Sequence, residues 1–303
     1  MKWIAKALVQ KVLSGLPQGD KLNYLLQRKT GGLPVSQSEF VEKVGYAHDR
    51  LRKWEKFGNS KPLNEIHCFE FGAGWDLIGP LAYWSFGVEH QTVIDIRRNL
   101  RPELLSDTVQ KFREYREQCE AATGRQLRTI PRELPVDPER LLQAFGIDYR
   151  APLDASETGL PSNSIDFIST NSTLEHIPAE SLARILPETR RLLFPDGIAC
   201  HFVDLKDHFS YFDSSITKYE FLTHSDAFWS VVNSSISYQN RLRYADYHRL
   251  FRDAKLRLID EEVRWGTEED MRAFRSLRLT SRFAKSDTDE HLAVQVIGVV
   301  LGK

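Results

Sequence analysis

The stretch IHCFEFGAGWD, residues 66–76, joins a short apolar run to a turn that contains two glycines. Residues 66–71 have the length and apolar character of a buried strand, and a helical pattern continues from the turn through Gly79. Gly72 and Gly74 allow the backbone to turn sharply and to approach another group closely. A strand that passes through such a turn into a helix is the repeating unit of parallel sheets covered by helices.

The alternation of short apolar runs and longer amphipathic stretches continues along the chain. It predicts further strands at residues 91–96, 147–150, 165–170 and 198–204, a tight turn at 194–197, and helices at 100–123, 178–194 and 244–254. The last two predicted strands, 256–264 and 291–301, are separated only by a helical insertion, which favours an antiparallel pair. We therefore expect an α/β fold, with a Rossmann-like seven-stranded sheet that is mostly parallel and has an antiparallel edge strand.

Residues 1–60 precede this alternation and are predicted to form an N-terminal helical cap, in which Ser36 or Ser38 caps a helix over residues 39–57. Residues 61–303 form the sheet-containing domain, interrupted by a helical and aromatic insertion at about 205–243. We expect the cap and the insertion to cover the open side of the sheet.

The first sixteen residues have the pattern of an amphipathic helix. Ile4, Leu8, Val12 and Leu16 follow helical spacing, and Trp3 flanks them. A helix docked on its own domain is the favoured interpretation, and an interfacial membrane anchor or a transit peptide is the alternative.

The composition excludes several classes of protein. The 303 residues hold 41 basic and 42 acidic side chains, so no global field attracts nucleic acid or an anionic membrane. The apolar runs are shorter than the ~18 residues that a membrane helix needs. Three widely spaced cysteines predict neither a disulfide framework nor a metal site, which favours the cytoplasm. The composition leaves the oligomeric state undetermined.

Acidic residues follow the first two predicted strands, where a nucleotide could bind. Glu70 precedes the two glycines, and Asp95 lies 21 positions after Gly74, close to the spacing of about 20 residues in βαβ nucleotide sites. The third glycine of a nicotinamide-dinucleotide fingerprint is replaced by Leu77, which disfavours a nicotinamide oxidoreductase.

In this order of motifs, residues 64–303 resemble the class I S-adenosylmethionine-dependent methyltransferases. The resemblance implies that Glu70, Gly72 and Gly74 hold the methionine part of the donor, that Asp95 holds the ribose, and that Asp154 and Ala155 face the adenine. It also implies that the loop 171–177, which begins with Asn171, lies beside the reacting methyl group. Asp196 departs from the family, which commonly has glycine there. Further residues, among them Trp75 and the run DLKDH at 204–208, look like a bacterial subgroup whose acceptor is unidentified.

The resemblance implies methyl transfer from S-adenosylmethionine, and we predict that the acceptor is a small or glycan-like molecule that is methylated at oxygen. A hydroxyl acceptor needs a proton acceptor, and His208 and His176 both follow predicted strands. We rank His208 first, with Asp207 or Glu175 as the acid that orients it. A regulatory or scaffold protein that binds the donor without turnover is the alternative.

Two groups of basic residues have both a functional and a structural interpretation. Arg241, Arg243 and Lys218 could bind an anionic or sugar-like acceptor, or form ion pairs. A predicted helix that begins at Thr267 carries an arginine stripe that extends to Arg282, which we interpret as a solvated face rather than a nucleic-acid site.

Overall fold

The computed structural model describes residues 2–29 and 32–303 and contains one seven-stranded sheet. The strand order is β3-β2-β1-β4-β5-β7-β6. The strands are β1 (His67–Phe71), β2 (His90–Ile94), β3 (Ile147–Arg150), β4 (Ile165–Asn171), β5 (Leu193–Asp204), β6 (Arg257–Arg264) and β7 (Val296–Gly302). β1 to β5 pair in parallel, and β7 is antiparallel to both β5 and β6. The predicted fold class is confirmed, although the antiparallel strand lies one place inside the edge.

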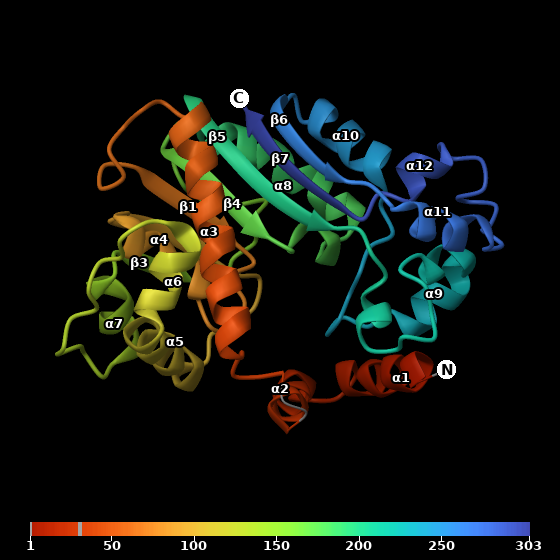
Figure 1. Ribbon diagram of the computed structural model, residues 1–303, viewed down its shortest axis with the longest axis horizontal. Helices are drawn as coiled ribbons and strands as arrows, with labels where there is room; N and C mark the ends of the chain where they lie inside the picture. The colour runs from red at the N-terminus through yellow and green to blue at the C-terminus, as the bar shows by residue number, and fades with distance from the viewer. Residues whose placement is uncertain (1, 30–31) are drawn as a thin grey trace.

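Helices cover both faces of the sheet (Figure 1). The N-terminal helices are α1 (Lys2–Ser14), α2 (Gly19–Lys29) and α3 (Gln37–Phe57). Those between the strands are α4 (Ile78–Phe86), α5 (Pro102–Glu114), α6 (Arg116–Thr123), α7 (Pro138–Ala144), η1 (Leu174–His176), α8 (Ala179–Leu192), η2 (His208–Tyr211), η3 (Glu220–Thr223), α9 (Asp226–Val232), α10 (Tyr244–Asp253), α11 (Glu268–Arg275) and α12 (Asp289–Leu292). No helix in this described part is long and apolar enough to cross a membrane.

Two hydrophobic cores occupy the two faces of the sheet. In β4, Phe167 belongs to the core beneath α3 and α4, and its neighbour Ile168 belongs to the core beneath α8 and α10. This separation follows from the period of two along a strand, which sends adjacent side chains to opposite faces. Residues 165–170 of β4 are therefore buried without interruption, because both faces of the sheet are covered.

The helix α3 belongs to the sheet's own core. Phe40, Leu51 and Trp54 on α3 are almost fully buried and share one cluster with residues of the strands. The helix begins with the predicted cap, since the Ser36 side chain accepts the Glu39 N–H in a capping box.

The first two helices lie below the sheet in Figure 1, with α1 beside α9. α1 docks through Trp3, whose ring lies 5.2 Å from that of Phe209 and whose backbone N–H donates to Asp213. Docking is therefore observed, but the predicted face was wrong, because Leu8 and Val12 are 45% and 65% exposed. Residues 1, 30 and 31 of the predicted cap lie outside the described residues.

Several predicted boundaries need correction. β5 begins at Leu193, and its register against β4 passes from the Ile165–Leu193 pair to the Phe167–Ile198 pair. Residues 194–197 are therefore a bulge within the strand and not a turn before it, which accommodates Pro195 because a bulge needs no ladder donor there. The predicted helix over residues 100–123 is divided at Tyr115 into α5 and α6, and the second part buries Cys119 in the core with α3.

The end of the chain also differs from prediction. His291 lies in α12, where Thr288 caps the helix, and β7 starts only at Val296. α11 begins at the predicted Thr267 cap but ends at Arg275, so the arginine stripe is not one helix face. Arg282, beyond that helix, pairs with Asp226 at 2.6 Å.

Candidate active site

The site lies where the strand order reverses, between β1 and β4, at the carboxyl ends of the parallel strands. Ligands of open α/β sheets bind at this position. A cavity of about 850 Å³ opens there, and its walls come from the turn after β1, the ends of β4 and β5, and α3. It is lined by Gln27, Leu33, Val35, Glu39, Glu42, Lys43, Tyr46, Ala47, Arg50, Glu70, Gly72, Ala73, Gly74, Trp75, Asp76, Ile78, Gly79, Tyr83, Ser169, Asn171, Ser172, His176, Asp204 and Tyr211.

The turn after β1 has the backbone that its glycines predict. Gly72 has φ +76° and Gly74 has φ +72°, both in the left-handed region. A Cβ atom on Gly72 would stand 2.3 Å from Cγ2 of Thr173, whereas one on Gly74 would meet no heavy atom within 4 Å. The missing side chain of Gly72 therefore makes room for the loop that contains Thr173. The missing side chain of Gly74 leaves its backbone accessible from the cavity.

Glu70 is a carboxylate in the cavity wall without a protein partner among the described residues. Its Oε2 lies 3.3 Å from the position of a Cβ on Gly79, at the start of α4. Burial raises the pKa of Glu70 to about 7, and Arg50 opposes this rise. An unpaired, partly buried carboxylate at this position is suited to a cationic ligand group.

Asp95 directly follows β2 and is held by the loops around it. Its carboxylate accepts N–H groups from Gly74 at 3.3 Å and Arg97 at 3.0 Å, and the Asn99 side-chain amide at 3.2 Å. Burial raises the pKa of this carboxyl group. Asp95 thus fastens the glycine turn to the end of β2.

The remaining predicted donor residues lie at successive strand ends. Asp154, after β3, accepts the Ser156 N–H at 2.8 Å, and Ala155 packs against the core beneath α8. Asn171 ends β4 and lines the cavity. The structure therefore places Asn171 in the cavity wall with Glu70, Gly72 and Gly74, while Asp95, Asp154 and Ala155 stand outside the cavity lining.

Arg50 was not predicted, yet it lines the cavity from α3. Its guanidinium donates to Thr170 O at 3.3 Å, to Tyr46 O at 2.6 Å and to Asn171 Oδ1 at 2.6 Å. In the sequence it is one basic residue of a helix that contains several, and no local signal distinguishes it. Only the packing of α3 on the sheet brings it to the ends of the strands.

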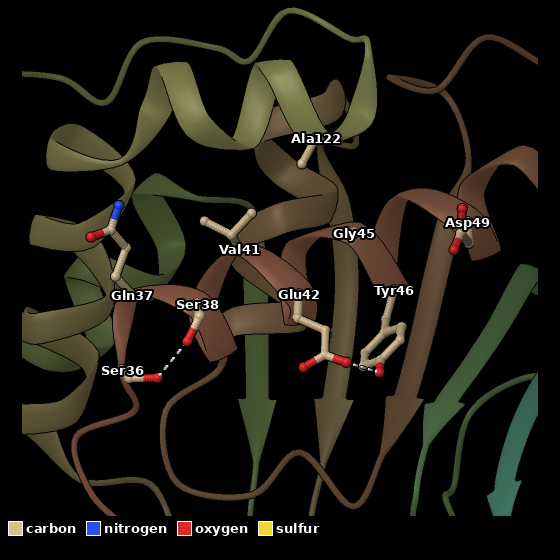
Figure 2. A pocket seen from close by; sticks show the side chains of 9 residues that line it. All are labelled: Ser36, Gln37, Ser38, Val41, Glu42, Gly45, Tyr46, Asp49 and Ala122. Atoms are coloured by element: carbon tan, nitrogen blue, oxygen red, sulfur yellow. Dashed lines mark hydrogen bonds between the residues drawn. The ribbon is translucent and has the colours of Figure 1, made fainter.

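A second, shallower hollow of about 740 Å³ runs along the same helix (Figure 2). It is lined mostly by α3 residues, among them Glu42, Tyr46 and Asp49. Glu42 accepts the Tyr46 hydroxyl, and both residues also line the larger cavity. Tyr46 therefore stands between the two hollows.

The two predicted histidines come together beside the larger cavity, which His176 lines and His208 does not. The rings of His176 and His208 have centroids 5.0 Å apart. Burial lowers the pKa of His208 to about 4 and also lowers the pKa of His176, so both imidazoles are neutral at pH 7. Nε2 of His208 is buried and has no hydrogen-bond partner within residues 2–29 and 32–303, and it lies 3.8 Å from Oδ2 of Asp204.

Tyr211 lines this end of the cavity, and the buried Glu175 lies next to it in the chain's packing around Asp204. Burial raises the pKa of Glu175 to about 8, and its Oε1 accepts the Asp204 N–H at 3.2 Å. The Tyr211 hydroxyl donates to Oδ2 of Asp204. Asp204 and Tyr211 were not singled out by the sequence as site residues, although Asp204 ends a predicted strand.

Asp207 does not orient His208 as predicted. Its two carboxylate oxygens accept the backbone N–H groups of Phe209 and Phe221, both at 2.9 Å, and it caps η2. Burial raises the pKa of Asp207 to about 7. The reason for the error is that Asp and Asn often bond to backbone two residues onward, which adjacency in sequence does not reveal.

The basic residues considered as acceptor ligands have structural roles. Arg243 is buried and donates to the carbonyls of Leu205, Leu292 and Val294. Arg241 binds Phe221 O and pairs with Asp226, and Lys218 pairs with Asp270 at 2.9 Å. Their structural interpretation is confirmed.

The comparisons with known proteins are consistent with this arrangement. Residues 137–201 match the sequence profile of a family described as a methyltransferase domain. No curated protein matches the sequence significantly. Among solved structures, a SAM-dependent methyltransferase from Leishmania major is similar at 12% identity and TM-score 0.45, covering 99% of this chain and 82% of the other.

Two further solved structures have a comparable degree of similarity. A SAM-dependent methyltransferase from Methanosarcina mazei has 14% identity and TM-score 0.40, with 79% of this chain and 93% of that chain covered. Geranyl diphosphate C-methyltransferase from Streptomyces coelicolor has 10% identity and TM-score 0.44, with 86% and 76% covered.

The cavity also fits the methyl donor that such a domain uses. S-adenosylmethionine carries an ammonium and a sulfonium group, and the unpaired Glu70 carboxylate supplies a negative charge. The open space at Gly74 lets a ligand approach the backbone. Residues 137–201 match the profile of a methyltransferase domain, and the seven-stranded sheet and this cavity are consistent with a class I S-adenosylmethionine-dependent methyltransferase.

Proposed function

We propose that this methyltransferase acts on an oxygen atom of a small-molecule or glycan-like acceptor, with His208 accepting the acceptor's proton. The observation that carries the proposal is the buried Nε2 of His208, which has no hydrogen-bond partner among the described residues and lies beside Asp204, a residue that lines the same cavity as Glu70. A neutral imidazole with a free lone pair can take a hydroxyl proton. An amine or carboxylate acceptor would not require such a group.

The surroundings of His208 support this assignment. Proton transfer would convert the imidazole to an imidazolium, and the carboxylate of Asp204, at 3.8 Å, would stabilise the positive charge. Tyr211, which donates to that carboxylate, would hold it in place. Asp204 thus replaces Asp207 as the acid proposed to position His208.

His176 is the second candidate for the proton acceptor. Its Nδ1 donates to the carbonyl of Tyr238 at 2.6 Å, so its Nε2 carries the lone pair. This hydrogen bond fixes the ring, and the residue lines the cavity. His176 is expected to orient the acceptor when His208 takes the proton.

The donor would be held by residues at the opposite end of the cavity. We assign the donor's ammonium group to Glu70 and its ribose to Asp95. We propose that the donor lies against the backbone at Gly72 and Gly74. Asp154 and Ala155 would lie beside its adenine, and Asn171 would border its methionine part. When bound, S-adenosylmethionine supplies a methyl group on a positively charged sulfur.

The N-terminal helical region and the insertion at 205–243 are proposed to cover this donor site. Gln27, Val35 and Tyr211 come from these segments and line the cavity. The three cysteines are free and buried, which supports a reducing compartment such as the cytoplasm.

Calorimetry with S-adenosylmethionine and its demethylated product, followed by a screen of hydroxyl, amine and carboxylate acceptors, tests the proposal. His208→Ala should lower turnover of a hydroxyl acceptor by about 100-fold to 10000-fold while donor affinity is kept. His90→Ala is a matched control, because His90 is exposed and begins β2 at the opposite end of the strands. Methylation of amines alone would contradict the oxygen assignment, and donor binding without any turnover would favour a regulatory protein.

A further inference from the structure

Three side chains beside the cavity converge as a group of metal-ligand type. Glu175 and His176 lie on η1, and His208 begins η2. One ligand atom of each residue lies within 4.8 Å of the ligand atoms of the other two. Two loops that follow neighbouring strands, β4 and β5, therefore bring two imidazole nitrogens and a carboxylate oxygen together.

Each of the three ligand atoms is available. Nε2 of His208 and Oε2 of Glu175 are buried and have no hydrogen-bond partner in the part of the chain that the structure describes, and Glu175 as a whole is only 1% exposed. Buried polar atoms are normally paired, so two unpaired atoms in one cluster need an explanation. A shared ion between them provides that explanation.

His176 also has the orientation of a metal ligand. Its Nδ1 donates to the Tyr238 carbonyl at 2.6 Å, which leaves the Nε2 lone pair free. Metal-ligating histidines almost always donate their other ring N–H to a carbonyl or carboxylate in this way, because the bond fixes the ring and its tautomer. Glu175 is held similarly, since its Oε1 accepts the Asp204 N–H.

We infer that Glu175, His176 and His208 bind one divalent transition-metal ion of the zinc type. Two histidines and one glutamate are a ligand set of catalytic zinc sites, which keep a further position open. Imidazole ligands favour such an ion over Mg²⁺ or Ca²⁺, which prefer oxygen. Ligand atoms at ~2.1 Å from a tetrahedral ion lie ~3.4 Å apart, so side-chain rotations must bring the three atoms closer than their present separations of up to 4.8 Å.

The ion would lie beside the cavity, because one of its three ligands, His176, lines it. Binding of the ion does not depend on the proposed function. The predicted effect of the ion on methyl transfer does rest on the proposed function. An ion that occupies both imidazole lone pairs removes the free proton acceptor. Zn²⁺ should therefore slow transfer to a hydroxyl acceptor, and a chelator should restore it.

The test is a titration of untagged, chelator-treated protein with Co²⁺, followed by visible absorption, and with Zn²⁺, followed by calorimetry. We expect one ion per chain and tetrahedral-type Co²⁺ absorption bands. His208→Ala, His176→Ala and Glu175→Gln should each weaken binding about 100-fold or more, since loss of an outer-shell partner alone costs about 10-fold to 100-fold. His90→Ala should bind as the wild type does.

His176 is exposed, so His176→Ala should fold as the wild type does and separates loss of binding from loss of folding. Calorimetry with the donor verifies that each variant is folded. Absence of saturable binding in the wild type, or unchanged binding in His176→Ala and His208→Ala, would overturn the inference. Methyl transfer that is unaffected by a chelator and lost in His208→Ala would then still support the proposed function. Conversely, saturable Zn²⁺ binding that accelerates transfer would support the metal site and contradict the free-imidazole role of His208.

Discussion

Replacing Gly72 by alanine should destabilise the protein more than replacing Gly74, although both glycines have the same backbone conformation. At φ +76° and +72°, a Cβ atom costs about 1–2 kcal/mol at either position. At Gly72 that atom would also meet Cγ2 of Thr173 at 2.3 Å, and overpacking of this kind costs about 1–3 kcal/mol. We expect a loss of about 2–5 kcal/mol for Gly72→Ala and about 1–2 kcal/mol for Gly74→Ala.

Urea unfolding of the wild type and the two variants measures these losses as differences in the free energy of unfolding. A third variant separates the two causes. Thr173→Ser removes Cγ2 and keeps the hydroxyl that donates to Asn171 O at 3.3 Å. In the Gly72→Ala background it should recover about 1 kcal/mol or more, and in the Gly74→Ala background it should recover nothing, because no atom lies within 4 Å of that Cβ.

For donor binding the order should be reversed, so that Gly74→Ala has the larger effect. Alanine at position 74 projects into the open space that the donor is proposed to use, so its loss of donor affinity should exceed its loss of stability. Equal destabilisation by the two alanines, or no recovery by Thr173→Ser, would refute the assignment of Gly72 to loop packing.

Other predictions concern the donor carboxylates and the exposed face of α1. Donor binding needs the ionised form of Glu70. Because the pKa of Glu70 is about 7, donor affinity should be about tenfold weaker at pH 6 than at pH 8. Calorimetry of Glu70→Gln should show weaker binding without this pH dependence. Asp95→Ala should cost about 1–3 kcal/mol of donor binding by the same measurement, and an unchanged affinity would contradict its proposed ribose contact. The exposed Leu8 and Val12, on a helix without acidic residues, should support sedimentation with anionic vesicles, and a Leu8→Ser/Val12→Ser double variant that still sediments would exclude this face as the contact.

The sequence was sufficient for the parts of the molecule that repeat a local pattern. The βα alternation, the glycine turn and the placement of Glu70 at a strand end follow from periodicity and turn chemistry within windows of about ten residues. The bulge in β5 could not be predicted in this way, because Pro195 and Gly197 are also typical of a turn. Only the pairing of β5 with β4 decides between the two.

The groups that surround the reaction end of the cavity depended on contacts between distant segments. Asp204 and Tyr211 meet His208 through the path of the chain after β5, and Arg50 reaches Asn171 from α3. Asp207 was misassigned because a carboxylate that caps a short helix has the same sequence neighbours as one that orients a histidine.

The boundary at residue 60 is the part of the predicted organisation with the clearest energetic consequence. Phe40, Leu51 and Trp54 on α3 are buried against the sheet, and burial of each large apolar side chain contributes about 1.5–3 kcal/mol. Their removal would cost about 5–9 kcal/mol, a large part of the 5–15 kcal/mol by which domains are usually stable.

A chain that starts at residue 61 should therefore fail to give a cooperative unfolding transition. A chain that starts at residue 33 loses only α1 and α2, of which α1 packs on the insertion through Trp3, and it should unfold cooperatively with a lower midpoint. Urea titrations of the two shortened chains, followed by tryptophan fluorescence and far-ultraviolet circular dichroism, compare them. A cooperative transition in the chain from residue 61 would mean that α3 is a detachable cap. If only the chain from residue 33 unfolds cooperatively, α3 is part of the same fold as the sheet.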